Sequence, residues 1–377
     1  MKNEKQQEKE YLFWLSNIEG IGAVTIDRLI LKFGNAKQVY FSDFNEIKQS
    51  GILSVKIMEN FIHAKKNKNK IMEIYHDLEK YNTRFITIYD NEYPGKLKNI
   101  YSKPYGIYVK GNLPDEKTHN TKEVTNKPSV AIIGARACTA YGLEIGNYLA
   151  KELAKYGVEI VSGMAYGIDA AAGRGAIESG GRTYAVLGSG VNICYPQANQ
   201  KLYNAILNSG GGIISEQPMN MPPLAKNFPM RNRIISGLAD CIIVVEAKQK
   251  SGTLITVDLG LEQGKDIFVV PGRINDLLSE GCNKLISMGA MIITSVDDIL
   301  NYFGLNEKNK KSKKIVISLA PNEKLLYSCL NLDPKHIEVI AVECELSIIE
   351  TMNILTALVS KGIVDSVSGS YYFKKYS

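Results

Sequence analysis

The sequence is poor in the residues that build metal centres and disulfide frameworks. Its 377 residues include four His and six Cys, and the cysteines are scattered without a Cys-x-x-Cys pair. This pattern indicates a reduced, cytoplasmic setting, and it disfavours both zinc ligation and catalysis by histidine. We therefore expect no metal site.

Long apolar runs are missing too. No stretch approaches the roughly 20 apolar residues that a membrane-spanning helix needs. The N-terminal stretch MKNEKQQEKEYLFWL mixes both charge signs and lacks the apolar region of a signal peptide. The net charge of +6 is mild, so charge alone is weak evidence for a nucleic-acid partner.

Residues 129–157 have the pattern of a strand, a glycine turn and a helix. The β-branched run 130–133 predicts the strand, Gly134-Ala135-Arg136 the turn, and apolar residues at helical spacing follow. Such a unit opens nucleotide-type α/β folds, because free N–H groups and the dipole at a helix start favour anions. Arg136 adds a planar cation suited to phosphate. A plain turn with a solvent-facing arginine accounts for the same residues.

Strand and helix patterns alternate from residue 129 to residue 300, which predicts an α/β fold. The alternation indicates one parallel sheet covered by helices on both faces. The expected strands are 130–133, 159–162, 183–187, 212–215, 241–246, 267–270 and 291–293. Segments 85–89 and 105–109 also have strand composition, and the polar segment 115–127 is expected to be a loop.

Glycine and polar residues cluster where four of these strands end. Carboxyl ends of parallel strands share one edge, where open α/β sheets bind their ligands. Small residues let the backbone approach a ligand, and their N–H groups can form anion-binding nests. We therefore expect a phosphate-bearing ligand at this edge, contacted by Gly134, Arg136, Ser162, Gly163, Gly188, Ser189, Gly190, Ser251, Gly252 and Thr253.

The segment AKNFPMRNRIISGL, residues 225–238, carries cations and an aromatic ring. A base stacked on Phe228 would contribute about 1–3 kcal/mol. Arginines just before an apolar helical pattern oppose the helix dipole unless an anion arrives. Alternatively, the ring is core and the arginines pair with carboxylates such as Glu216 and Glu246, and we expect one arginine to do so. The candidate phosphate contacts are Lys226, Arg231 and Arg233.

The remaining segments predict flanking domains. Residues 1–80 predict a small helical domain, and residues 81–300 hold the sheet with its lead-in. Gly20 and Gly22 resemble the turn of a helix-hairpin-helix DNA binder, but a glycine turn in a SAM-like bundle is the simpler interpretation. Residues 301–320 are charged and predict a linker.

Residues 321–377 predict a winged helix. Asn322 and Ser347 are expected to cap helices, and the third helix is expected over 348–361, followed by a hairpin with its turn at 368–370. The third helix carries Glu350, and Lys361 is its only basic residue. Protein contact or an accessory role therefore competes with reading of the major groove.

Several stretches together resemble the DNA-processing protein A family, also called Smf: SVAIIGARACTAYG, IVSGMAYGIDAAA, YAVLGSGVNICYP, FPMRNRIISGLAD and VVEAKQKSGTLIT. The resemblance covers about residues 129–293. It implies a Rossmann-like core that binds single-stranded DNA, loads RecA recombinase during natural transformation and forms a homodimer. It implies no enzyme activity, no catalytic residue and no cofactor, and it adds Asn232 to the DNA contacts.

The sequence departs from the family pattern at three positions. Gly173 stands where the family usually has His, and Ala135 replaces a hydroxyl residue in the first turn. Ala225 occupies a place that is often basic, which leaves the nearest cation at Lys226. The arginine of the turn is kept.

Three other classes remain as alternatives. A nicotinamide-dependent dehydrogenase needs GxGxxG after the first strand, and GARACTAYG lacks it. A nucleoside-monophosphate phosphoribohydrolase of the lysine-decarboxylase-like type carries PGGxGTxxE, but residues 248–256 have neither the double glycine nor the catalytic Glu. A transcription factor would bind duplex DNA through residues 321–377 alone.

Overall fold

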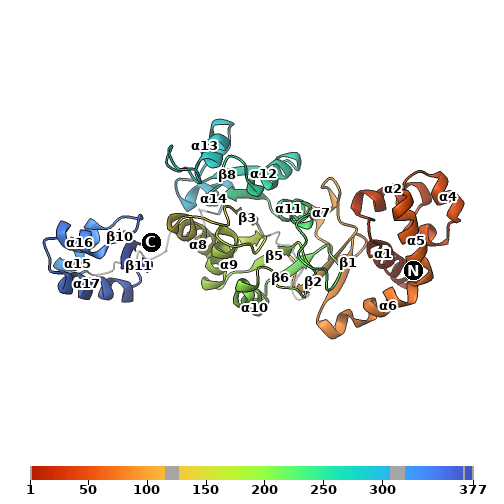
Figure 1. Cartoon of the computed structure of the whole chain (residues 1–377), viewed down its shortest axis with the longest axis horizontal. Helices are drawn as coiled ribbons and strands as arrows, with labels where there is room; N and C mark the ends of the chain where they lie inside the picture. Colours follow the sequence, from red (N-terminus) through yellow and green to blue (C-terminus); the bar gives the residue numbers. More distant parts are fainter. Residues whose placement is uncertain (1, 115–126, 306–318, 368–369, 376–377) are drawn as a thin grey trace.

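The computed structural model of the chain describes residues 2–114, 127–305, 319–367 and 370–375. Its elements form N-terminal helices, a large α/β core and a small C-terminal unit (Figure 1). Residues 115–126 of the expected loop and 306–318 of the expected linker lie outside the described residues. Helix α14 (Val296–Tyr302) extends into the range expected as linker.

The core is built on a nine-stranded sheet with the order β1-β2-β6-β5-β4-β3-β7-β8-β9. The strands β3 to β9 pair in parallel, and β1 and β2 add to the β6 edge in antiparallel fashion. The strands are β1 (Arg84–Thr87), β2 (Gly106–Gly111), β3 (Ser129–Ile133), β4 (Glu159–Ser162), β5 (Thr183–Leu187), β6 (Gly212–Ser215), β7 (Cys241–Val244), β8 (Asp266–Val269) and β9 (Met291–Ile292).

All the strands expected from the sequence are present, with their ends within two residues of the expected positions. The parallel sheet expected over residues 129–300 is confirmed, and the lead-in adds two antiparallel strands to it. The segment between β1 and β2 contains only the short helix α7 (Gly95–Lys98), and it leads the chain back so that β2 pairs directly with β1. Because this connection does not cross over the sheet, the two lead-in strands run antiparallel.

Helices cover both faces of the sheet, as the sequence predicts. In β3, Ala131 and Ile133 point to one face, and Val130 and Ile132 point to the other. The first face is covered by α7 (Gly95–Lys98), α11 (Asn227–Leu238), α12 (Gly252–Glu262) and α13 (Glu280–Ser287). The second is covered by α8 (Ala140–Lys155), α9 (Ile168–Glu178), α10 (Gln200–Asn208) and α14, with a 3₁₀ turn η2 (Gln197–Asn199) before α10.

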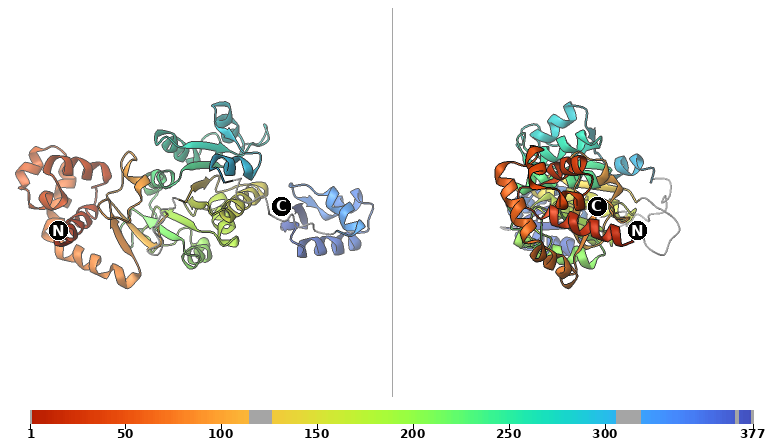
Figure 2. Two further views of the ribbon diagram at one scale, coloured as in Figure 1. Left: turned by 180° about the vertical axis from the view of Figure 1, so that it is seen from behind. Right: turned by 90° about the vertical axis from the view of Figure 1, so that its right-hand side faces the viewer.

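The N-terminal helices lie beside β1 and β2 in both views (Figures 1 and 2). The hydroxyl of Tyr105 donates to Asp27 at 2.6 Å, and that of Tyr108 donates to Asn17 at 3.0 Å. The elements are α1 (Lys2–Ser16), α2 (Ala23–Phe33), α3 (Ala36–Phe41), α4 (Phe44–Gln49), α5 (Val55–Lys66), α6 (Lys68–Asp77) and η1 (Leu78–Tyr81). The expected glycine turn therefore joins α1 to α2 and faces the core.

The C-terminal unit has three helices and a three-stranded sheet ordered β10-β12-β11. Ser347 caps the third helix as expected, accepting from the Glu350 N–H. The expectation for Asn322 is wrong, because the helix starts at Pro321 and its N-cap is Ala320, two residues before Asn322, and Glu323 accepts from the Ala320 N–H. The elements are α15 (Pro321–Cys329), β10 (Lys335–His336), α16 (Ile337–Glu343), α17 (Ile348–Ser360), β11 (Val364–Val367) and β12 (Tyr371–Lys374).

Candidate functional site

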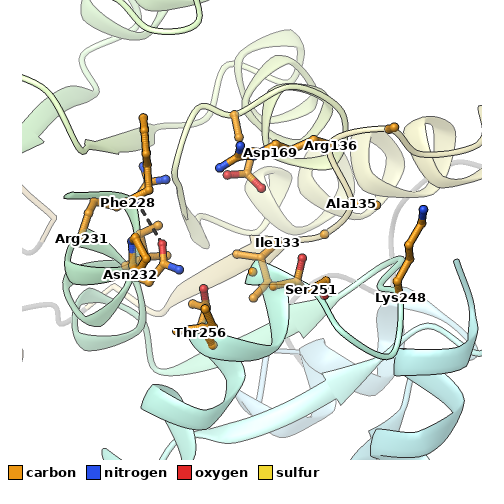
Figure 3. A pocket seen from close by; sticks show the side chains of 18 of the residues that line it. Ile133, Ala135, Arg136, Asp169, Phe228, Arg231, Asn232, Lys248, Ser251 and Thr256 are labelled. Atoms are coloured by element: carbon orange, nitrogen blue, oxygen red, sulfur yellow. Dashed lines mark hydrogen bonds between the residues drawn. The ribbon is translucent and has the colours of Figure 1, made fainter. Parts of the chain in front are cut away.

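A cavity of about 640 Å³ opens at the carboxyl ends of β3, β4 and β7. The strand order changes direction between β3 and β7, and such a switch point is where open α/β sheets leave room for a ligand. Figure 3 shows side chains entering the cavity from three segments: Phe228 and Asn232 from α11, Asp169 from α9, and Ser251 from the start of α12.

The cavity brings together eight of the fifteen residues that the sequence suggested as ligand contacts. They are Gly134, Arg136, Phe228, Arg231, Asn232, Ser251, Gly252 and Thr253. The other seven lie outside its lining: Ser162, Gly163, Gly188, Ser189, Gly190, Lys226 and Arg233. The glycine clusters therefore converge only in part.

The N-terminus of α8, expected to face an anion, is occupied by a carboxylate of the protein itself. Glu246, 3% exposed, accepts from the Thr139 N–H at 2.9 Å and from the Thr139 hydroxyl. The Ala135 N–H donates to the Glu246 carbonyl oxygen at 2.7 Å. An internal carboxylate therefore takes the Thr139 donors at the start of α8, where the helix dipole favours a negative charge.

The start of α12 is open by comparison. Its N-cap residue Ser251 makes no capping hydrogen bond, and its Oγ is buried without a hydrogen-bond partner among the described residues. The first turn of α12 lines the cavity with Gly252 and Thr253. The first N–H groups of a helix have no intrahelical partners. Anion-binding capacity at this edge is therefore found at α12 rather than at α8.

Arg231 forms part of the cavity floor. Its guanidinium donates to the carbonyl oxygens of Gly163, at 2.9 Å, and Val186, which tie it to the ends of β4 and β5. A Cβ on Gly163 would lie 2.6 Å from that guanidinium, so glycine is required at this position. Burial lowers the pKa of Arg231 to about 10, which leaves it charged at neutral pH. Arg231 therefore holds the floor and supplies positive charge to the cavity.

Asp169 is the anionic partner beneath the cavity. It accepts from the Gly163 N–H at 2.9 Å, and it is 6% exposed. Burial raises the pKa of Asp169, and the charge of Arg231 opposes that rise. Asp169 therefore helps to hold Gly163 and Arg231 in position at the bottom of the cavity.

Arg136 is an exposed cation of the cavity, as is Lys248. Arg136 makes no salt bridge within the described ranges, and its guanidinium carbon lies 5.7 Å from the centre of the Phe228 ring. Phe228 in turn lies 5.5 Å from the ring of Tyr195, with 38° between the ring planes. The cavity wall thus offers two rings and a cation that forms no direct salt bridge in the described residues.

Arg233 and Lys226 point elsewhere. Arg233 forms a two-pronged salt bridge with Glu216, at 2.7 and 2.8 Å, and donates to the Ser102 carbonyl oxygen. The expectation that one arginine pairs with a carboxylate is confirmed. Because helix α11 starts at Asn227, Arg231 and Arg233 lie beyond its first turn, which corrects the expected position. Lys226 lines a separate cavity of about 570 Å³ beside the turn between α1 and α2.

The remaining glycine-cluster residues have structural contacts. Ser162 accepts from the Met164 N–H, and Ser189 donates to the Ile193 carbonyl oxygen. The Gly188 carbonyl oxygen accepts from Asn227, and the Gly190 N–H donates to Met221. These residues shape the loops behind the cavity.

Sequence reasoning missed three charged or aromatic residues of the lining: Asp169, Tyr195 and Lys248. Asp169 and Tyr195 lie in the quoted stretches IVSGMAYGIDAAA and YAVLGSGVNICYP, and Lys248 lies three residues before Ser251. The signal for each was its place in the segment that follows a strand end: β4 for Asp169, β5 for Tyr195 and β7 for Lys248. Across the described ranges there is no group of three or more His, Cys, Asp or Glu that could hold a metal ion.

A mostly parallel α/β sheet with a cavity at its switch point places the protein among the open α/β proteins, whose ligand sites lie at this edge of the sheet. The chain belongs to the DNA recombination-mediator protein A family, whose model matches residues 84–304. No helix in the described residues has the length and apolar character to cross a membrane.

Two curated relatives illustrate the similarity. The DNA processing protein DprA of Streptococcus pneumoniae is 42% identical over 217 residues, which are 58% of this chain and 73% of that protein. The DNA processing protein DprA of Bacillus subtilis is 38% identical over 245 residues, which are 63% of this chain and 80% of that protein.

Two solved structures resemble the chain. The crystal structure of the Streptococcus pneumoniae protein matches with a TM-score of 0.65 and 31% identity, over 78% of this chain and 97% of that one. A structure of the Helicobacter pylori protein, described for its single-stranded DNA binding mode, has a TM-score of 0.51 and 29% identity, over 59% and 97% of the two chains.

Proposed function

We propose that this protein binds single-stranded DNA in the cavity at the switch point. The observation that carries the proposal is Arg136, an exposed cation beside two neighbouring rings and opposite the open start of α12. Arg136, Lys248 and the first turn of α12 would take backbone phosphates, and bases would stack on Phe228 and Tyr195. Stacking on rings and backbone contacts tolerate any sequence, as single-strand binding requires.

The biological role that fits this activity is loading of RecA recombinase on incoming strands during natural transformation, in the cytoplasm. The relatives named DNA processing protein support it, as does the Helicobacter pylori protein described with single-stranded DNA. In this role the protein holds the strand and catalyses no reaction. RecA filament growth on single-stranded DNA should then accelerate when the protein is added.

Two further features belong to the proposal. The C-terminal unit is a winged helix, supported by its three helices and its β11–β12 hairpin.

The protein forms a homodimer through its core. The exposed side chains of Met291 and Ile292 in the edge strand β9, and of Met288 just before it, provide apolar surface for the dimer interface. Edge strands with apolar side chains are prone to pair.

A phosphoribohydrolase acting on nucleoside monophosphates is the alternative. The open start of α12 suits a single phosphate as well as a DNA backbone. General acid-base help at the ribose would need a carboxylate free to exchange a proton with the substrate, but Asp169 in the cavity lining is 6% exposed and accepts from the Gly163 N–H, and Glu246 accepts from Thr139. Release of free base from nucleoside monophosphates would favour this alternative.

The test is titration with labelled single-stranded and duplex oligonucleotides across a salt series. The single strand should bind more tightly, and log affinity should fall with log salt by about 0.7 per phosphate neutralised. Equal or tighter binding of duplex would overturn the proposal.

A further inference from the structure

Helix α17 exposes an apolar face that the fold of the C-terminal unit does not use. Ile349 is 75% exposed, Met352 53% and Ile348 51%. Leu358, on the side of the helix opposite Ile349, and Leu355, on the flank next to Ile348, fill the core of the unit and are fully buried. Since the core is complete without the outward residues, their exposure calls for another explanation.

The same outward face carries no charge. At the helical repeat of 3.6 residues, Val359 falls beside Ile348 and Met352, whereas Asn353, Thr356 and Ser360 fall beside Ile349, and all four are exposed. From Ile348 to Val359 the face rises by about 17 Å, the length of three helical turns. This area would accept the side of one helix of similar length.

The surroundings of this face are acidic. The segment Ile337–Ser360, which contains α16 and α17, has no Lys or Arg, and its acidic residues are Glu338, Glu343, Glu345 and Glu350. Glu343 forms a salt bridge with Lys335 of the neighbouring strand β10, at 2.6 Å. The other three carboxylates are exposed and have no Lys or Arg partner among the described residues. Glu350 lies in the first turn of α17 and Glu345 lies just before its N-cap, so the charges at the N-terminal end of the face are negative. At the other end, Lys361 is paired with Glu323 at 2.6 Å.

The charge pattern decides which partner fits. A winged helix that reads duplex DNA places basic and amide side chains of this helix against the DNA, and here phosphates would meet carboxylates instead. A second copy of the same face would bring no free cation to these carboxylates. A partner that carries an apolar stripe between Lys or Arg side chains satisfies both the apolar face and these carboxylates.

We propose that the outward face of α17 is a docking site for a basic amphipathic helix of a partner protein. The apolar stripe of that helix would cover Ile348, Ile349 and Met352, and its cations would lie against Glu338, Glu345 and Glu350. The site is separate from the DNA cavity and does not depend on the function proposed for it.

The test uses the full chain and a fluorescein-labelled peptide of about 14 residues, built of Leu and Lys at helical spacing so that it spans the face. A peptide of the same composition in scrambled order and a Leu–Glu peptide with the same spacing serve as controls. The Leu–Lys helix should bind at least tenfold more tightly than either control. Glu345→Gln should weaken it, and more so at low salt than at high salt.

Two variants distinguish binding of the peptide to the docking face from nonspecific binding elsewhere on the protein. Ile349→Glu combined with Met352→Glu should lower affinity for the Leu–Lys peptide at least tenfold, with single-stranded DNA binding unchanged. Val55→Glu is the matched control, because Val55 is 80% exposed on α5, and its effect should stay within twofold. Circular dichroism verifies that each variant is folded.

Three outcomes would overturn the proposal. The first is a double variant that binds the peptide as tightly as the parent chain. The second is a double variant that loses affinity for duplex DNA instead. The third is a lower molar mass of the double variant in sedimentation, which would assign the face to a second copy of this chain.

Discussion

Arg136 and Arg231 both lie near Phe228, at 5.7 and 5.9 Å from the ring centre, yet their surroundings differ. Arg231 is buried and donates to two strand-end carbonyl groups. Arg136 is exposed and makes no salt bridge in the described part of the chain. The first is needed for the shape of the cavity, and the second is available to a ligand.

Replacing Arg136 with Ala should weaken single-strand binding by about 1–3 kcal/mol, the range for a charge-assisted hydrogen bond. The salt dependence should become shallower by roughly one phosphate. The melting temperature should barely change, because Arg136 is exposed. Fluorescence anisotropy and calorimetry measure the two effects. Unchanged affinity, or a large loss of melting temperature, would contradict the assignment.

For Glu246 we expect the opposite result: its replacement should lower folding stability and leave single-strand affinity unchanged. Replacing it with Ala removes the acceptor of the Thr139 N–H and hydroxyl at the start of α8. Buried donors without a partner should cost about 1–3 kcal/mol of folding stability. Single-strand affinity should not fall, since the cavity loses no cation. A drop in affinity with unchanged stability would show that Glu246 is not a cap but part of the ligand site.

At the scale of elements, the strands were predictable because short β-branched runs between glycines have few other structures available. Val130–Ile133 is an example, and β3 is observed at Ser129–Ile133. The cap on α8 was not predictable, because Glu246 lies 107 residues from Thr139 in the chain. Only the parallel pairing of β3 with β7 brings them together.

The same distinction applies to the candidate site. The cluster at Gly134 and Arg136 follows a strand whose end forms the cavity, so local pattern was enough. Lys226 and Arg233 share the cationic segment with Phe228, but helix α11 directs them to other surfaces. Which side of a helix faces a cavity depends on packing that the segment alone does not encode.

The capping box of α17 gives a prediction at this scale. Ser347→Ala should destabilise the helix by about 1 kcal/mol, the usual effect of losing an N-cap. Faster amide hydrogen exchange in α17 would report it. Thr356→Ala on the same helix is the control, and it should leave exchange unchanged or slower because Ala favours helix.

The box also predicts a pH dependence. Hydrogen bonds from the Ser347 side chain and backbone lower the pKa of Glu350 below its usual 4.5. The stabilisation is therefore present above the unfolded pKa and is lost as the pH falls through the lower, folded value. Exchange in α17 should rise below about pH 4.5 in the parent chain. The Ser347→Ala chain should show less of this rise.

At the scale of the whole molecule, the DNA cavity and the C-terminal unit are built from separate cores. The cavity lining runs from Ile133 to Leu278, and the core of the C-terminal unit contains only residues from Leu319 onward. An ion pair joins Arg273 to Asp333, but both side chains are more than half exposed. Such pairs contribute little to stability.

Removing residues 321–377 should therefore leave a folded core that still binds single-stranded DNA. Every cation and ring assigned to the cavity is retained, so we expect affinity within about threefold of the full chain and the same salt dependence, since the same phosphates are neutralised. Circular dichroism verifies folding, and anisotropy titration with a labelled single strand measures binding.

Basic residues near the C-terminus, such as Lys374 and Lys375, are the source of any small loss of affinity, and Lys374→Ala in the full chain would reproduce that loss. If the truncated chain is folded and no longer binds, the cavity does not bind DNA by itself, and the C-terminal unit supplies contacts that the proposed function assigns to Arg136, Phe228 and α12.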